Sequence, residues 1–224
     1  MKQFKNIPIF IVSYNRLEDL KLLISRLEKD GYNNIIILDN SSTDKSLLEY
    51  LKGLASIYKV HFLEKNYGHM VLWECGLYNQ FIKDNYYVLT DPDIIPIDEC
   101  PDNYVEVFWE ILEKFPKKHK VGFALKIDDI PDSYPYKWDI IRYESFYRNK
   151  ITDAKYTIYD APIDTTFALY APRNRFAAFD DEGFTSGIRM GYPFVARHLS
   201  WYLNPCNMSD EHKLYFGGVK VPLQ

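Results

Sequence analysis

The sequence of 224 residues is poor in cysteine and has no excess of basic residues. Its three cysteines, Cys75, Cys100 and Cys206, lie far apart and form no Cys-x-x-Cys pair. This spacing argues against a zinc ribbon or a disulfide framework and favours a reducing compartment. The formal net charge of −4 disfavours a protein dedicated to nucleic-acid binding, because such proteins usually carry a basic excess.

Long apolar runs are also missing from the sequence. The run near the start, residues 7–12, is too short for a secretory signal, and no stretch approaches the roughly 18 apolar residues of a membrane span. We therefore expect a cytoplasmic protein that can still attach to the inner face of a membrane. Hydrophobic residues make up 47% of the chain, which is enough for a sizeable core.

The first half of the chain alternates short apolar runs with segments of helical spacing. The runs predict strands at residues 9–12, 35–38, 60–63, 86–90 and 121–125, and the spacing predicts helices at residues 17–27, 47–54, 73–81 and 105–115. Asn15 and Glu18 resemble a capping box for the first helix, and residues 41–43 can cap the second. Alternation of this kind predicts an α/β domain with a mostly parallel central sheet flanked by helices. A less regular second half includes a strand predicted at residues 166–170.

Polar side chains follow three of the predicted strands. Residues 13–16 come after the first strand, Asp39 and Asn40 after the second, and Asp91 and Asp93 after the fourth. The carboxyl ends of parallel strands share one edge of a sheet, and open α/β sheets bind ligands at that edge. The sequence therefore predicts a ligand site built from these residues.

Two common nucleotide motifs are absent from this edge. Neither a G-x-G-x-x-G turn nor a G-x-x-x-x-G-K-[ST] loop occurs, which argues against dinucleotide enzymes and P-loop kinases. The segment Asp91-Pro92-Asp93 offers two hard oxygen ligands, with Pro92 stiffening the turn. Such a pair suits Mg²⁺ or Mn²⁺ and could hold a diphosphate leaving group. The alternative is ordinary turn chemistry.

Four motifs, which follow one another along the chain, resemble those of a known family. They are IPIFIVSYNR, IILDNSSTD, EKNYGH and LTDPDI, and together they look like the nucleotide-sugar half of family-2 glycosyltransferases with the Rossmann-like GT-A fold. The resemblance covers residues 7–98. We expect one domain over residues 1–224, with residues 1–98 as the nucleotide-sugar half and residues 99–224 as the acceptor and catalytic half.

The resemblance implies roles for individual residues of the first half. Asp39 would accept the imide N–H of uracil or thymine, with capping of the next helix as the alternative. Asp91 would contact the ribose or sugar, and Asp93 would bind the metal. The nucleoside would be surrounded by Ser13, Tyr14 and Arg16, and Pro92 would stiffen the acidic turn. The ribose and diphosphate would be approached by Asn66, Gly68 and His69; the alternative is that these three residues form an ordinary turn.

The second half must supply a base that deprotonates the acceptor hydroxyl. Asp164 is our candidate, because it begins a predicted strand that should lie near Asp91; the alternative is a simple turn carboxylate. The acidic cluster Asp180, Asp181 and Glu182 is a second possible source of the base. His198 resembles the C-terminal histidine that completes the metal shell in this fold, although it could instead be a half-buried histidine packed on Trp201.

These features together predict a metal-dependent glycosyltransferase. It would move a sugar from a UDP- or dTDP-linked donor to a hydroxyl of a glycan or lipid-linked acceptor, with inversion, using Mn²⁺ or Mg²⁺, in cell-surface polysaccharide synthesis. Two other readings stay open. A nucleotidyltransferase also uses carboxylates at this edge, but it normally shows a glycine-rich basic loop. A non-catalytic module that binds sugar nucleotides or glycans would keep the fold without turnover.

Overall fold

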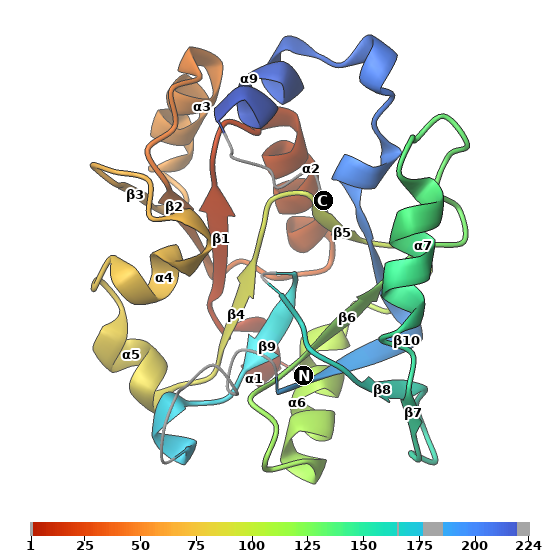
Figure 1. The fold of residues 1–224 in the computed structure, drawn as a ribbon. Helices are drawn as coiled ribbons and strands as arrows, with labels where there is room; N and C mark the ends of the chain where they lie inside the picture. The colour runs from red at the N-terminus through yellow and green to blue at the C-terminus, as the bar shows by residue number, and fades with distance from the viewer. Residues whose placement is uncertain (1, 165, 177–185, 219–224) are drawn as a thin grey trace.

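The computed structural model describes residues 2–164, 166–176 and 186–218 (Figure 1). Within these residues, ten strands form one sheet. The strands are β1 (Ile9–Ser13), β2 (Ile35–Asp39), β3 (Lys59–Phe62), β4 (Tyr87–Thr90), β5 (Ile94–Pro96), β6 (Lys120–Leu125), β7 (Lys150–Ile151), β8 (Ile158–Asp160), β9 (Ala168–Tyr170) and β10 (Gly187–His198).

Helices lie between the strands and cover the sheet. They are α1 (Lys2–Lys5), α2 (Leu17–Lys29), α3 (Lys45–Leu54), α4 (Val71–Glu74), α5 (Asn79–Asp84), α6 (Tyr104–Lys114), α7 (Lys137–Ser145) and α9 (Asp210–Gly218). Short 3₁₀ turns are η1 (Gly68–Met70), η2 (Arg173–Arg175), η3 (Leu199–Tyr202) and η4 (Pro205–Asn207). No helix of the described part of the chain is both long and apolar enough to cross a bilayer. The predicted α/β class with flanking helices is confirmed.

The strand order is β3-β2-β1-β4-β9-β6-β10-β8-β7, and β5 pairs with β10. Strands β3, β2, β1 and β4 are parallel, as the alternating first half predicts. Strand β9 then runs antiparallel between β4 and β6, and β6 and β10 are parallel again. The strands of both predicted halves therefore join in a single sheet, and β1, β2 and β4 end at the same edge.

The core lies on both faces of this sheet. Along β1, Ile9 and Ile11 pack with residues of α2, α3 and α6 on one face, whereas Phe10 and Val12 pack with residues of α4 and α5 on the other. Because strand side chains alternate, a strand buried on both faces must be apolar at every position. This explains why residues 9–12 read as one continuous apolar run.

Three local predictions were wrong. The helix predicted over residues 73–81 is two short helices, α4 and α5, separated near Gly76, whose φ of +75° is left-handed. The capping box is absent, because α2 begins after Arg16 with no side-chain cap. The cap of α3 is Asp44, which accepts from the Leu47 amide at 2.7 Å, rather than a residue of 41–43.

Candidate functional site

Ser13 and Asp39 end neighbouring parallel strands and are paired in register. Both are buried, at 0% and 2% exposure. Within the described residues, Ser13 Oγ and Asp39 Oδ1 have no hydrogen-bond partner. Buried polar atoms are normally hydrogen-bonded, so two such atoms side by side indicate a place where a ligand supplies the missing partners.

Within the part of the chain that the structure describes, the hydrogen-bond contacts of Asp39 are with Ser42 and are weak. Its Oδ2 accepts from the Ser42 amide at 3.4 Å. Burial raises the pKa of Asp39, and hydrogen bonds from Ser42 offset this only in part. The capping alternative is wrong, because Asp44 caps α3. Asp39 is thus a buried carboxylate with an acceptor atom available to a ligand.

Asn15 joins the loop after β1 to the loop after β2. Its Oδ1 accepts from the backbone amides of Thr43 and Asp44 at 2.8 Å and 3.0 Å. The backbone amide of Asn15 donates to Ser42 Oγ at 3.0 Å. Asn15 has a φ of 48°, which asparagine tolerates better than most residues. This clamp holds the two loops on either side of Ser13 and Asp39.

Asn40 organises a third loop at the same edge. Its Nδ2 donates to Asn66 Oδ1 at 2.9 Å and to Gly68 O at 3.0 Å, and its Oδ1 accepts from the Tyr67 amide at 2.8 Å. Gly68 has a φ of +67°, so this loop requires a glycine. Asn66, Gly68 and the adjacent His69 are exposed beside the buried pair. The sequence placed Asn40 at this edge, directly after Asp39, but predicted no individual role for it.

Asp93 lies at the centre of a buried ionic network. Its Oδ2 accepts from Arg16 Nη1 at 2.8 Å and from Ser200 Oγ at 2.7 Å, and lies 2.9 Å from His198 Nε2. The antiparallel pairing of β10 with β5, which sets His198 opposite Ile94, brings the histidine to this position. Two residues predicted from distant segments therefore contact each other.

The charges of this network balance one another. Burial alone would raise the pKa of Asp93, but His198 and Arg16 outweigh it and hold that pKa well below its usual range. Burial would lower the pKa of His198, but the negative charge of Asp93 outweighs this effect and raises it. Asp93 is consequently an ionised carboxylate held by an arginine and a histidine.

Arg16 also binds groups that sequence reasoning missed. Its Nε donates to Asp19 Oδ2 and its Nη2 to Ser200 Oγ, each at 2.8 Å, and the guanidinium lies 4.3 Å from the ring centroid of Tyr215 on α9. Figure 1 shows α9 above the carboxyl end of β1. Asp19, three residues after Arg16, is the one partner that helical spacing could have indicated.

The acidic turn contains donor types that suit a divalent cation. Asp91 is half-buried, and Pro92 and Asp93 are buried. Carboxylate and imidazole donors are the right kinds of ligand for Mg²⁺ or Mn²⁺. In this structure, however, His198 Nε2 contacts Asp93 and Arg16 supplies the opposing charge. In the described residues, no group of three or more His, Cys, Asp or Glu residues is arranged to hold a metal ion. The role of His198 as a ligand stays a prediction. Its Nδ1 is buried and has no hydrogen-bond partner among the described residues, so it could bind an ion while Nε2 keeps its contact with Asp93.

Asp164 lies in the loop before β9. The strand begins at Ala168, so the expectation that Asp164 starts it was wrong. Asp164 is exposed. Burial raises the pKa of Tyr170 well above its usual value, and Tyr87, Asp164 and Asp91 add to that rise. Asp164 and Asp91 are therefore both near Tyr170. The alternative cluster, Asp180, Asp181 and Glu182, lies outside the described residues.

Tyr14 and His198 also have aromatic neighbours. The rings of Tyr14 and Tyr215 are 6.3 Å apart, and those of His198 and Trp201 are 4.8 Å apart. Trp201 is buried. His198 therefore packs on Trp201, as one reading of the sequence expected, and contacts Asp93 as well.

Comparisons with known proteins identify the family of the chain. A family model described as glycosyl transferase family 2 matches residues 9–173, which confirms the resemblance and the GT-A fold expected from the motifs. No curated protein matches the chain significantly. Among solved structures, the chain is similar to the mannosyltransferase PcManGT from Pyrobaculum calidifontis, in complex with GDP-mannose and Mn²⁺, at 13% identity and a TM-score of 0.45. That match covers 74% of this chain and 44% of the mannosyltransferase.

Proposed function

Because the chain belongs to glycosyl transferase family 2, we propose that it transfers a sugar from a UDP- or dTDP-linked donor to a hydroxyl of a glycan or lipid-linked acceptor. The proposal places this reaction in cell-surface polysaccharide synthesis on the cytoplasmic side of a membrane, where a lipid-linked acceptor would hold the enzyme at the surface. The main observation in its support is that two neighbouring buried atoms, Ser13 Oγ and Asp39 Oδ1, have no hydrogen-bond partner within the described part of the chain.

The chemistry of Asp39 favours a base with a ring N–H. A buried carboxylate accepts a hydrogen bond but cannot donate one when ionised. Uracil and thymine carry an imide N–H, whereas cytosine and adenine present a ring acceptor in the corresponding place. A base without the donor would leave Asp39 buried and unpaired, which is the condition that gives strong discrimination.

In this proposal, the ribose and diphosphate of a nucleotide whose base binds Asp39 lie beside the loop held by Asn40. Asn66, Gly68 and His69 are exposed there, and the backbone of Gly68 allows close approach. Asp91 would contact the ribose or sugar. Tyr14 and Arg16 complete the surroundings of the nucleoside in this proposal, and Pro92 keeps the acidic turn rigid. Arg16 also sets the charge balance beside the diphosphate through Asp93.

In the proposed reaction, Asp164 accepts the proton of the acceptor hydroxyl. The acceptor oxygen forms a bond to the anomeric carbon, while the bond from that carbon to the diphosphate oxygen breaks and the electron pair leaves with the diphosphate. Attack from the face opposite the leaving group inverts the anomeric centre. A divalent cation held by Asp93 and His198, with Mn²⁺ and Mg²⁺ as the candidates, would supply positive charge to the diphosphate when bound.

Calorimetric titration with UDP, dTDP, GDP, CDP and ADP tests the donor site. Each nucleotide is titrated with Mn²⁺ and again with EDTA, into wild-type protein and into Asp39→Asn. We expect UDP or dTDP to bind best, and Asp39→Asn to weaken that binding at least tenfold, because the amide cannot replace a charged acceptor. Equal binding with Mn²⁺ and with EDTA would overturn the metal requirement.

Asp139→Asn is the matched control, because Asp139 is an exposed carboxylate on α7 that pairs with Arg142. It should bind every nucleotide as the wild type does. Failure of all five diphosphates to bind would overturn the proposed function. Preferential binding of CDP or ADP would overturn the role of Asp39. Preferential binding of GDP, whose guanine also carries a ring N–H, would overturn the UDP- or dTDP-linked donor.

A further inference from the structure

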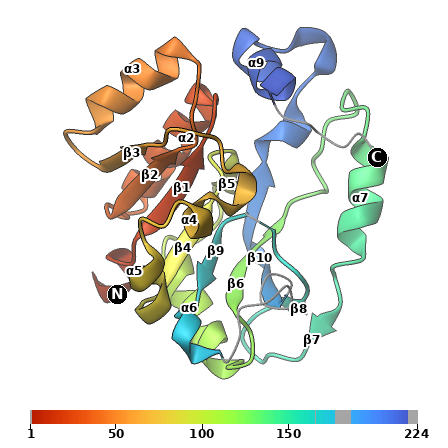
Figure 2. The same ribbon diagram turned by 60° about the vertical axis from the view of Figure 1, so that its left-hand side comes forward.

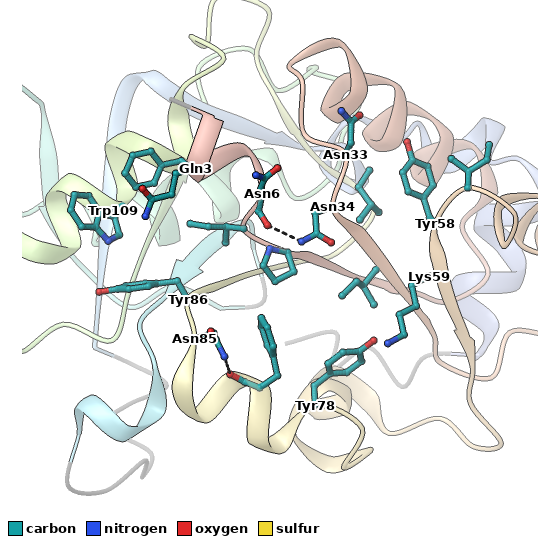
Figure 3. A pocket seen from close by; sticks show the side chains of 17 residues that line it. Gln3, Asn6, Asn33, Asn34, Tyr58, Lys59, Tyr78, Asn85, Tyr86 and Trp109 are labelled. Atoms are coloured by element: carbon teal, nitrogen blue, oxygen red, sulfur yellow. Dashed lines mark hydrogen bonds between the residues drawn. The ribbon is translucent and has the colours of Figure 1, made fainter.

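A groove of about 840 Å³ opens at the amino ends of β1, β2, β3 and β4, the edge opposite Ser13 and Asp39 (Figure 3). Its walls come from α1 and the segment after it, the turns before β2, β3 and β4, and helices α5 and α6. The volume is in the range of sites for small ligands. No step of the proposed reaction uses it.

The lining of this groove is almost uncharged. Of the 17 residues that line it, Lys59 alone carries a full charge, whereas 26% of the chain is charged. Five members of the lining are amides: Gln3, Asn6, Asn33, Asn34 and Asn85. Each amide offers both a donor and an acceptor, so this surface suits a neutral ligand rich in hydroxyl groups.

The side-chain amides that line the groove are exposed, and hydrogen bonds to the backbone orient two of them. Asn34 Nδ2 donates to Asn6 O at 2.7 Å, and Asn85 Nδ2 donates to Phe81 O at 3.0 Å. Within the described residues, these bonds use the amide nitrogens and leave each Oδ1 for a ligand. All five amide residues are exposed to solvent.

Aromatic rings stand at both ends of the groove. Figure 3 shows Trp109 and Tyr86 on one side and Tyr58 and Tyr78 on the other, with Asn6 and Asn34 between them. Bonds to neighbours hold the rings: Tyr86 Oη donates to Glu113 at 2.6 Å and Tyr78 Oη lies 2.8 Å from His61 Nε2. Held rings cost little entropy on binding. Trp109, Tyr86 and Tyr78 are half-buried and offer part of a flat apolar face to the C–H groups of a sugar, whereas Tyr58 is buried.

We propose that this groove is a second carbohydrate site, which binds a neutral oligosaccharide by aromatic contacts at its two ends and amide hydrogen bonds between them. The proposal does not depend on the transferase function. In a transferase, such a site would retain a chain of sugars while its end is extended at the opposite edge.

Nuclear magnetic resonance of ¹⁵N-labelled protein tests the site, with maltohexaose, cellohexaose and mannohexaose as probes. We expect at least one of them to give saturable shifts of the side-chain amides of Asn6, Asn34 and Asn85. Trp109→Leu removes a flat face while keeping apolar contact with Phe4, and it should weaken that binding at least tenfold. Trp138→Leu changes a tryptophan that is 74% exposed on α7, outside the groove, and should bind like the wild type.

The other outcomes overturn the proposal. They are no shift at these amides with any of the three saccharides at millimolar concentration, shifts confined to the edge of Ser13 and Asp39, and shifts of the same amides that appear on concentrating the protein without saccharide. The last result would mark a contact between copies of the chain. Titration of Trp109→Leu with UDP and dTDP separates this proposal from the donor site, because nucleotide affinity should not change.

Discussion

Arg16 Nη1 lies 2.8 Å from Asp93 Oδ2, joining the loop after β1 to the acidic turn after β4. Both side chains are almost completely buried, at 3% and 1% exposure. The same guanidinium reaches Asp19 and Ser200. One arginine thus connects the helix after β1, the acidic turn and the segment after β10. Together with His198, it provides the charge that lets Asp93 stay ionised inside the protein.

Arg16→Ala should therefore destabilise the fold strongly. Removing one partner of a buried ion pair leaves the other charge uncompensated, which typically costs about 3–5 kcal/mol. The free energy of unfolding is best measured in urea, because guanidinium chloride would screen the charges under test. Asp93→Asn in the Arg16→Ala background should restore part of the loss, since it removes the unpaired charge.

Arg142→Ala provides the comparison for Arg16. Arg142 pairs with Asp139 at 3.0 Å on the exposed side of α7, and its side chain is 74% exposed. Exposed pairs contribute little, so this variant should unfold nearly as the wild type does. A similar small effect for Arg16→Ala would contradict the structural role given to the Arg16–Asp93 pair.

Much of the sheet edge that carries Ser13 and Asp39 was predictable because strand ends are local features. Residues 9–12 and 35–38 are apolar at every position, and the polar residue that follows each run marks its end. Parallel neighbours then bring Ser13 and Asp39 to one edge without any knowledge of loops. The same reasoning placed Asp91 and Asp93.

Features that depend on pairing between distant segments were not predictable from local patterns, and only the family resemblance indicated His198. Ser200 contacts Asp93 because β10 pairs with β5 across about a hundred residues, and no local pattern encodes that register. Tyr215 is placed over Arg16 by the position of α9. Asn15 resembled a helix cap, but its side chain bonds across to the next loop instead.

Asp164→Asn should lower turnover while leaving donor affinity unchanged. A general base contributes about 10²–10⁴-fold to rate, and the amide cannot accept the proton. Because the acceptor is unidentified, the rate of diphosphate release from a UDP- or dTDP-sugar, with water as acceptor, is the readout. The dissociation constant for the free diphosphate, measured on the same preparation, shows whether the donor site is intact.

Asp160→Asn serves as the control for Asp164. Asp160 is a half-exposed carboxylate at the end of β8 that pairs with Lys118. Its substitution should change neither the rate of diphosphate release nor the dissociation constant of the free diphosphate. Full turnover in Asp164→Asn would overturn its role and direct attention to Asp180, Asp181 and Glu182. Wild-type protein that binds the diphosphate but never releases it from a donor sugar would favour the reading as a binding module.

Lys120 is a fully buried lysine at the start of β6. Its Nζ lies 3.3 Å from Tyr170 Oη, and 4.9 Å from the centroid of the Tyr170 ring. Burial lowers the pKa of Lys120 to about 7; Asp164, from the loop before β9, raises it, and Arg189, from β10, lowers it further. The folded protein therefore releases this proton at a lower pH than the unfolded chain does.

The sign of the effect on stability follows from the protons bound. Below pH 7, Lys120 is protonated in both states. Between pH 7 and the ordinary lysine pKa of about 10.4, the unfolded chain holds the proton and the folded protein does not, so the free energy of unfolding rises with pH. The contribution of Lys120 cannot exceed about 1.4 kcal/mol per pH unit, the limit for one proton.

Urea unfolding of wild-type protein and Lys120→Met at pH 6.5, 8 and 9.5 isolates this contribution, because all other titrating groups are common to the two proteins. The wild type should gain stability relative to Lys120→Met as the pH rises. Lys52→Met changes an exposed lysine on α3, and its difference from the wild type should stay constant over the same range. A constant difference for Lys120→Met as well would mean that Lys120 keeps its ordinary pKa in the fold, and that groups around Tyr170 stabilise its ammonium.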